Sequence, residues 1–196
     1  VDLTQESIGG TMELLEAVNT VMPYLGEHVV TDVDTTKHPT VDLILMGLER
    51  NRKALLSEGW WFNDVIKVPL QPDTSGRIPA PSDSLNVYGY EKEVVVDGQF
   101  LFNLTDNTTV FDAGVNVRYT RDIEFQDLPY YAACTVLYKT AMEIYTADLG
   151  IDSNFQLIQA LYEENRRKLV QDNLRNRGYN TTRPIGGRFR GFIRRH

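Results

Sequence analysis

The chain has 196 residues, of which 42% are hydrophobic and 24% are charged, and its formal net charge is −7. This length predicts one domain with room for a small insert, which can fold without disulfides or metals. Its one cysteine, Cys134, can form neither an internal disulfide nor a cysteine-rich zinc site. The longest run without a charged residue, Leu128 to Tyr138, is shorter than the roughly 20 apolar residues of a membrane-spanning helix. The first residues lack the pattern of a secretory signal, so we expect a soluble, cytoplasmic protein with no membrane partner.

The charges are unevenly distributed along the chain. All 27 acidic residues precede Arg175, whereas seven of the 20 lysines and arginines lie from Arg175 onward. The segment 178–196 has no helical or strand period, which is typical of a flexible arm that becomes ordered on a partner. Its phenylalanines lie between arginines, a composition suited to a protein groove or to nucleic acid. The acidic remainder predicts poor DNA binding, because Lys and Arg drive the binding of phosphates. Such a surface suits a passage through which DNA slides.

Two helices are predicted in the first third of the chain. Thr11 is the expected N-cap of the first helix, and Gly26 is its stop. The second helix is expected to begin at Pro39 or Thr40 and to end at Gly59 as a left-handed cap. The solvent side of the second helix is expected to carry Glu49, Arg50, Arg52 and Lys53.

The middle third has the pattern of a small antiparallel sheet. Residues 69–81 contain four of the eight prolines, which indicates a loop or a sheet edge. Residues 93–102 indicate a β-hairpin with Asp97 and Gly98 in its two-residue turn. Residues 115–119 alternate between apolar and polar side chains, as a further strand would.

Two more helices are predicted after this sheet. The first begins at Gln126 or Asp127, with Pro129 in its first turn, and is apolar nearly all round, so it is expected in the core or in a subunit interface. The second spans residues 153–176. The predicted fold class is therefore α+β. Residues 1–66 and 126–177 form an antiparallel helical-bundle core, residues 67–125 form a β-hairpin and sheet insert, and residues 178–196 form a flexible, arginine-rich C-terminal arm.

The sequence contains no recognisable catalytic or metal-binding pattern. The three histidines are not accompanied by a nucleophile turn, and no complete phosphate-binding loop is present. A calcium loop beginning at Asp32 fails, because Lys37 and Leu43 occupy the positions that need Gly and Glu. Glu163 and Glu164 point about 100° apart on a helix, so they are not a ready-made glycosidase pair. We therefore predict no catalytic residue, no metal site and no cofactor.

The order of the motifs resembles a family of phage proteins. Residues 48–64, LERNRKALLSEGWWFND, contain a Gly-Trp-x-Phe-Asn element at positions 59–63. A hairpin region follows, then a Phe-Asp-x-Gly-Val motif at positions 111–115, and then Asp-Leu-Pro at positions 127–129 before an apolar helix. In this order, over about residues 11–180, the chain resembles the tail tubular protein A family of short-tailed bacteriophages, which are head-to-tail adaptors.

This resemblance implies a structural function and no enzymatic activity. Members of the family form a ring of twelve subunits between the portal protein and the tail nozzle protein, tail tubular protein B. Genomic DNA passes through the ring without specific binding during ejection. The sheet insert would face the nozzle and the tail fibres. The protein would be assembled in the host cytoplasm and would reside in the tail of the virion.

The resemblance also implies two sets of contact residues. Seven residues of the C-terminal arm would bind the portal protein: Arg183, Arg188, Phe189, Arg190, Phe192, Arg194 and Arg195. Three adjacent aromatic residues would contribute to the contact between subunits: Trp60, Trp61 and Phe62.

Two other functions stay open on the residues alone. One is a tail-associated glycan hydrolase, which needs a concave pocket with two facing carboxylates. The other is a nucleic-acid-binding module that acts through the arginine-rich arm. Deleting residues 181–196 distinguishes these functions. A nucleic-acid-binding module would lose DNA binding and keep portal docking, whereas an adaptor would lose portal docking.

Overall fold

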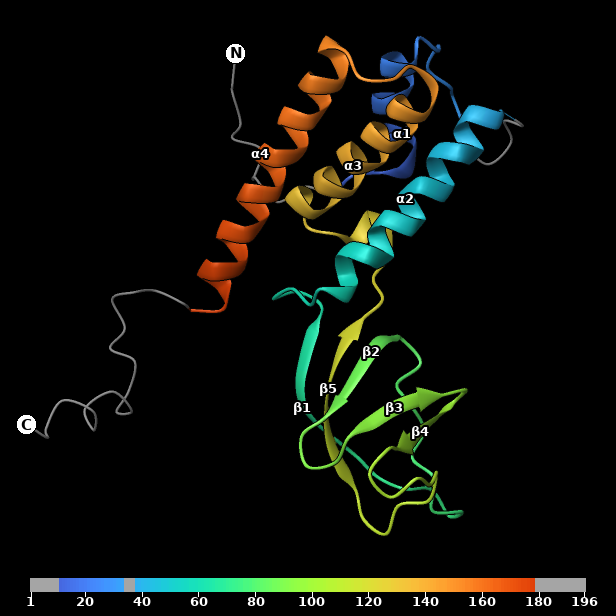
Figure 1. The fold of residues 1–196 in the computed structure, drawn as a ribbon, viewed down its shortest axis with the longest axis vertical. Helices are drawn as coiled ribbons and strands as arrows, with labels where there is room; N and C mark the ends of the chain where they lie inside the picture. Colours follow the sequence, from blue (N-terminus) through green and yellow to red (C-terminus); the bar gives the residue numbers. More distant parts are fainter. Residues whose placement is uncertain (1–10, 34–37, 179–196) are drawn as a thin grey trace, which may run out of the picture.

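The computed structural model describes residues 11–33 and 38–178, in which a layer of helices lies above a smaller region of strands (Figure 1). Helix α1 (Leu14–Val21) continues into a 3-10 turn, η1 (Met22–Leu25), which ends at Gly26 with a φ of 74°. Helix α2 (Pro39–Ser57) is followed by Gly59, also with a φ of 74°. These ends agree with the predicted glycine stops. The start of α1 was predicted wrongly, because Thr11 lies before the helix and the N-cap position belongs to a residue whose side chain makes no capping bond.

The helices after the strands are α3 (Tyr130–Asp148) and α4 (Ser153–Asn176), preceded by a short 3-10 turn, η2 (Phe125–Asp127). The bounds of α4 are those predicted. Pro129 lies at the N-cap of α3 rather than in its first turn, because η2 takes up the preceding residues as a separate turn.

Helix α4 begins at a capping aspartate. The carboxylate of Asp152 accepts hydrogen bonds from the N–H groups of Asn154 and Phe155, both at 2.9 Å, and from the Tyr145 hydroxyl at 2.8 Å. The bond from the Phe155 N–H, followed by the one from Tyr145, holds the pKa of Asp152 below its ordinary value.

The described residues contain five strands in two antiparallel sheets. Strands β1 (Asp64–Leu70), β5 (Val115–Arg121) and β2 (Ser84–Gly89) are neighbours in that order, and β3 (Val94–Asp97) pairs with β4 (Phe100–Asn103). The mixed α+β class is therefore confirmed. Along the chain, α1 and α2 precede the strands, and α3 and α4 follow them.

The predicted hairpin forms, but its turn lies one residue later than expected. Asp97 pairs with Phe100, so the two turn residues are Gly98 and Gln99. Gly98 has a φ of 60°, and a positive φ at the first turn position is typical of the type II′ turn.

Strand β1 is an edge strand with an irregular backbone. Its register against β5 shifts between Val65 and Val68, and Lys67 within this bulge has a φ of 56°. Pro69, in the same strand, has no N–H to offer a further strand. The proline-rich segment therefore begins in a sheet edge, one of the two predicted outcomes.

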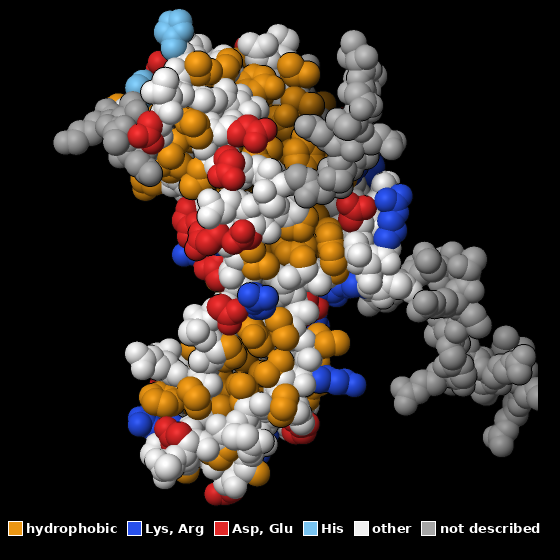
Figure 2. Space-filling view, turned by 180° about the vertical axis from the view of Figure 1, so that it is seen from behind, with side chains coloured by type: hydrophobic (Ala, Val, Ile, Leu, Met, Phe, Trp, Pro, Cys, Tyr) orange, Lys and Arg blue, Asp and Glu red, His pale blue; other side chains and the backbone are white. Residues whose placement is uncertain are grey.

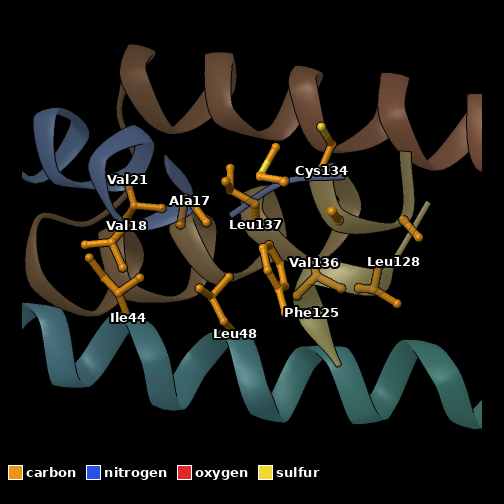
Figure 3. Close-up of a cluster of buried hydrophobic side chains, with 14 of the residues drawn as sticks. Ala17, Val18, Val21, Ile44, Leu48, Phe125, Leu128, Cys134, Val136 and Leu137 are labelled. Atoms are coloured by element: carbon orange, nitrogen blue, oxygen red, sulfur yellow. The ribbon is translucent and has the colours of Figure 1, made fainter. Parts of the chain in front are cut away.

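Buried hydrophobic side chains form two clusters. The larger one joins the helices, and Figure 3 shows α3 between α2 and α4, with Leu137 and Val136 of α3 beside Leu48 of α2. The smaller cluster joins the two sheets and includes Leu101 and Val117. The apolar composition of α3 is thus explained by contact with helices on more than one side. None of the helices in residues 11–33 and 38–178 has the length and apolar character needed to cross a membrane.

Candidate functional site

A candidate binding surface lies where the end of α4 meets the outer face of the three-stranded sheet. A hollow of about 420 Å³ is present there, which we term the junction hollow. It is lined by Trp61, Asp64, Ile66, Tyr90, Arg118, Asn176 and Arg177. Four segments that are far apart in the sequence therefore build one surface.

The Gly-Trp-x-Phe-Asn element connects α2 to the sheet through one buried amide. The side chain of Asn63 accepts a hydrogen bond from the Trp60 N–H at 2.7 Å. It donates two bonds, to the carbonyl of Leu56 at 2.9 Å and to the carbonyl of Arg121 at 3.0 Å. Asn63 is fully buried, so these bonds are not exchanged with water. This amide fixes the direction in which the chain passes from the helical layer into β1.

The three adjacent aromatic residues have different environments. Trp60 is 4% exposed, and its indole N–H donates to the carbonyl of Leu55 at 2.8 Å, so it belongs to the core of the helical layer. Trp61 and Phe62 are half-buried, with ring centroids 4.9 Å apart. Only Trp61 of the three lines the junction hollow. A contact between subunits therefore remains an expectation for Trp61 and Phe62, which keep some exposed surface.

One carboxylate joins three parts of the fold beneath the junction hollow. Asp64 accepts two hydrogen bonds from Arg118 of β5, at 2.7 and 2.9 Å, and one from Arg177, just after α4, at 2.7 Å. Arg177 also donates to the carbonyl of Gly59 at 2.9 Å. The Asp64 side chain is 6% exposed, and its hydrogen bond raises the pKa of Arg118. This cluster, the Asp64 clamp, fixes the place where the chain leaves α4.

A second buried ion pair corrects the predicted solvent face of α2. Arg52 is 2% exposed, whereas it was expected in solvent beside Glu49. Its guanidinium bonds Glu49 at 2.8 Å, Asp122 at 2.5 Å and the carbonyl of Ile123. The residues after β5 supply the acceptors that make this burial possible. Arg52 was wrongly predicted to be exposed because its partner Asp122 lies 70 positions away in the sequence.

Helices α2 and α3 approach closely at Gly47. A Cβ atom at this position would lie 2.6 Å from Cγ2 of Thr140. The Thr140 hydroxyl accepts from Asn51 at 3.1 Å and donates to the carbonyl of Val136 at 2.9 Å, so this side chain is held in place.

The carboxylates that line the junction hollow and a second hollow are poorly arranged for acid–base catalysis. Asp64 is neutralised by two guanidinium groups. At the far end of the helical layer, Glu27 and Asp148 line a second hollow of about 260 Å³. Both residues are exposed, and neither has a hydrogen-bond or ion-pair partner among the described residues that would fix its position. Within residues 11–33 and 38–178, no group of three His, Cys, Asp or Glu side chains is placed to hold a metal ion.

The residues predicted to bind the portal protein lie outside the described residues. These are Arg183, Arg188, Phe189, Arg190, Phe192, Arg194 and Arg195. Conversely, sequence reasoning missed the Asp64 clamp. The motif that contains Asp64 was recognised, but its partners Arg118 and Arg177 lie 54 and 113 positions further along the chain, and no local pattern connects them.

Comparison with known proteins identifies the family. A family model described as "Tail tubular protein" matches residues 15–179, a range that includes all of α1 but its first residue, helices α2 to α4, the strands and the junction hollow. A "Tail tubular protein A" from Klebsiella phage KP34 is 34% identical over 186 residues, which cover 94% of this chain and 97% of that protein. The resemblance inferred from the order of the motifs is confirmed. The chain is a member of the tail tubular protein family.

Proposed function

We propose that this protein is a structural adaptor in a phage tail. Twelve copies would form a ring between the portal protein and the tail nozzle protein, tail tubular protein B, and genomic DNA would pass through the ring during ejection. The observation that carries the proposal is the family match over residues 15–179, together with a relative that aligns over 94% of the chain. The ring, its partners and the passage of DNA extend beyond what the name of that relative states.

The shape of the helical layer supports a ring. Helices α2 and α4 lie at opposite margins of the layer, with α3 between them (Figure 1). Each margin exposes apolar side chains: Met46 on α2 is 71% exposed, and Leu157 and Leu174 on α4 are 53% and 47% exposed. A closed ring requires two different surfaces on each subunit, one for each neighbour. Two separate apolar margins meet this requirement.

The Asp64 clamp supports a role for the C-terminal arm. It holds Arg177 against the sheet, so residues 178–196 begin from a fixed point beside the junction hollow. We propose that the arginines and phenylalanines of this arm bind the portal protein. Several arms acting together would bind strongly even if each one is weak, because the later contacts are intramolecular.

Native mass spectrometry of the chain mixed with the portal protein tests the proposal. The full chain should give a complex with many copies per portal, and a chain lacking residues 181–196 should fold but fail to join it. A chain in which these residues are replaced by a Gly/Ser segment of equal length serves as the matched control and should fail as well. Portal docking that survives the deletion would contradict the role of the arm. Loss of DNA binding with portal docking intact would favour a nucleic-acid-binding module instead.

A further inference from the structure

The outer face of the three-stranded sheet carries exposed aromatic and apolar side chains. On β5, Val117 faces the buried cluster between the sheets, whereas Arg118 faces outward and lies opposite Tyr88 in the β2 register. Ile66, Tyr88 and Tyr90 are 58%, 54% and 50% exposed. Tyrosine and arginine are enriched among the residues that dominate binding energy at protein interfaces. This composition favours a protein partner over solvent.

The residues that line the junction hollow carry two positive charges, on Arg118 and Arg177, and one negative charge, on Asp64. Glu91 bonds Asn116, two positions before Arg118 on β5. Two arginines, Arg118 and Arg177, share one carboxylate in the junction hollow, and Lys67 in the β1 bulge is exposed with no ion-pair partner among the described residues. Figure 2 shows Lys and Arg side chains along the right-hand margin of the view and a group of Asp and Glu side chains toward the left of its upper half. A partner segment that carries carboxylates would therefore be attracted to the hollow.

The same chain presents such a segment beside α2. Glu124 and Asp127 are exposed, and neither has an ion-pair partner in the described part of the chain. The segment is held rigidly, because Phe125 is 4% exposed in the helical core and Asp122 is bonded to the buried Arg52. Two exposed carboxylates are thus carried by one short segment, at the N-cap and at the last residue of η2.

The two surfaces are held at different places in the fold. The segment 124–127 is anchored in the helical core beside α2, and the junction hollow is anchored by the Asp64 clamp at the end of α4. Contact between them requires two copies of the chain, each using a different surface, which is the arrangement that closes a ring.

We infer that residues 124–127 of one subunit dock into the junction hollow of the next. Glu124 and Asp127 would face Arg118 and Lys67, and the rings of Trp61 and Tyr90 would pack against the same turn. This inference rests on the proposed ring, and it names the two surfaces that form the contact.

Cysteine cross-linking in assembled tails tests the contact. In the variant Tyr90→Cys with Gln126→Cys, a short bismaleimide should join neighbouring subunits and give a ladder of dimers, trimers and larger products on a denaturing gel. Each single variant should give no ladder. The matched control, Leu104→Cys with Gln126→Cys, should also give none, because Leu104 is 49% exposed but lies outside the hollow. The native Cys134 does not interfere, since it is buried and burial raises its pKa.

The outcomes separate this inference from the proposed function. Assembled tails that contain the double variant but show no ladder overturn the docking of residues 124–127. So does a product in which position 90 is joined to a different protein. If the Tyr90 variant does not assemble, Asn176→Cys replaces it, because Asn176 is exposed and lines the same hollow. Failure of the unmodified chain to join the portal would contradict the adaptor function instead.

Discussion

The buried amide of Asn63 offers a direct test of how the helical layer is joined to the sheet. Asn63→Ala would remove three hydrogen bonds and leave the Trp60 N–H and the carbonyls of Leu56 and Arg121 without this partner. Each buried group left unsatisfied costs about 1–3 kcal/mol, and the three costs are not additive. We expect the free energy of unfolding to fall by about 3–4 kcal/mol, measured by urea denaturation of the full chain. Asn86→Ala is the matched control, since Asn86 makes one exposed bond of 3.3 Å, and it should cost less than about 0.5 kcal/mol.

Asn63→Asp refines this prediction through its pH dependence. The new carboxylate would keep the acceptor for the Trp60 N–H, but its second oxygen would face two carbonyl oxygens in a dry site. Burial and these oxygens raise the pKa of the carboxyl in the folded state, so the folded protein binds the proton more tightly than the unfolded chain. The variant should therefore lose stability as the pH rises above about 4, with a limiting slope of about 1.4 kcal/mol per pH unit. A loss below about 1 kcal/mol for Asn63→Ala, or the same pH profile for Asn63→Asp and the unmodified chain, would refute the reasoning.

Three further predictions concern stability. Asp64→Asn should lower the free energy of unfolding by about 2–3 kcal/mol in urea titrations, because two guanidinium groups lose their shared anion. The control Arg175→Gln, which removes the exposed ion pair with Asp172, should change the free energy of unfolding by less than about 0.5 kcal/mol. Gly47→Ala should cost about 1–2 kcal/mol through its clash with Thr140, and adding Thr140→Ser should recover most of this loss; equal melting temperatures for the single and double variants would contradict the clash. Asp152→Ala should lower the melting temperature at neutral pH. The pKa of Asp152 is lowered in the folded state, so its contribution to the stability of the fold is present above the unfolded pKa of about 3.9 and is lost as the pH falls through the folded pKa. A difference in melting temperature between the variant and the unmodified chain that persists at pH 2 would argue against the cap.

Local signals were sufficient for much of the fold. Pro39 and Gly59 delimit α2, and the spacing of apolar residues gave α4 its observed ends. These features depend on backbone preferences of a few adjacent residues, which the sequence displays directly. The hairpin was predicted for the same reason, although Gly98 serves as the first turn residue rather than the second.

Features that depend on distant partners were not predictable. Arg52 looked like a surface residue because Glu49 lies one turn before it, and its burial depends on Asp122. Strand β1 was not predicted as a strand, because Lys67 and Pro69 interrupt its alternation, and it exists through pairing with β5. Chain topology, rather than local pattern, brings these residues together.

The candidate site shows the same division. The Gly-Trp-x-Phe-Asn element was recognised from its residues, and the structure explains it as a connector centred on Asn63. The junction hollow was not foreseen, because it needs Arg118 and Arg177 to meet at Asp64. Exposure also corrected one expectation, since Trp60 is a core residue while Trp61 lines the surface.

The irregular backbone of β1 has a consequence for the life of the protein before assembly. An open edge strand offers its unpaired N–H and C=O groups to the same edge of another molecule, and such pairing leads to aggregation. The bulge at Lys67 and the missing N–H of Pro69 deny such pairing a regular row of donors and acceptors. In the proposed ring, contacts between copies would therefore come from side-chain surfaces rather than from strand pairing.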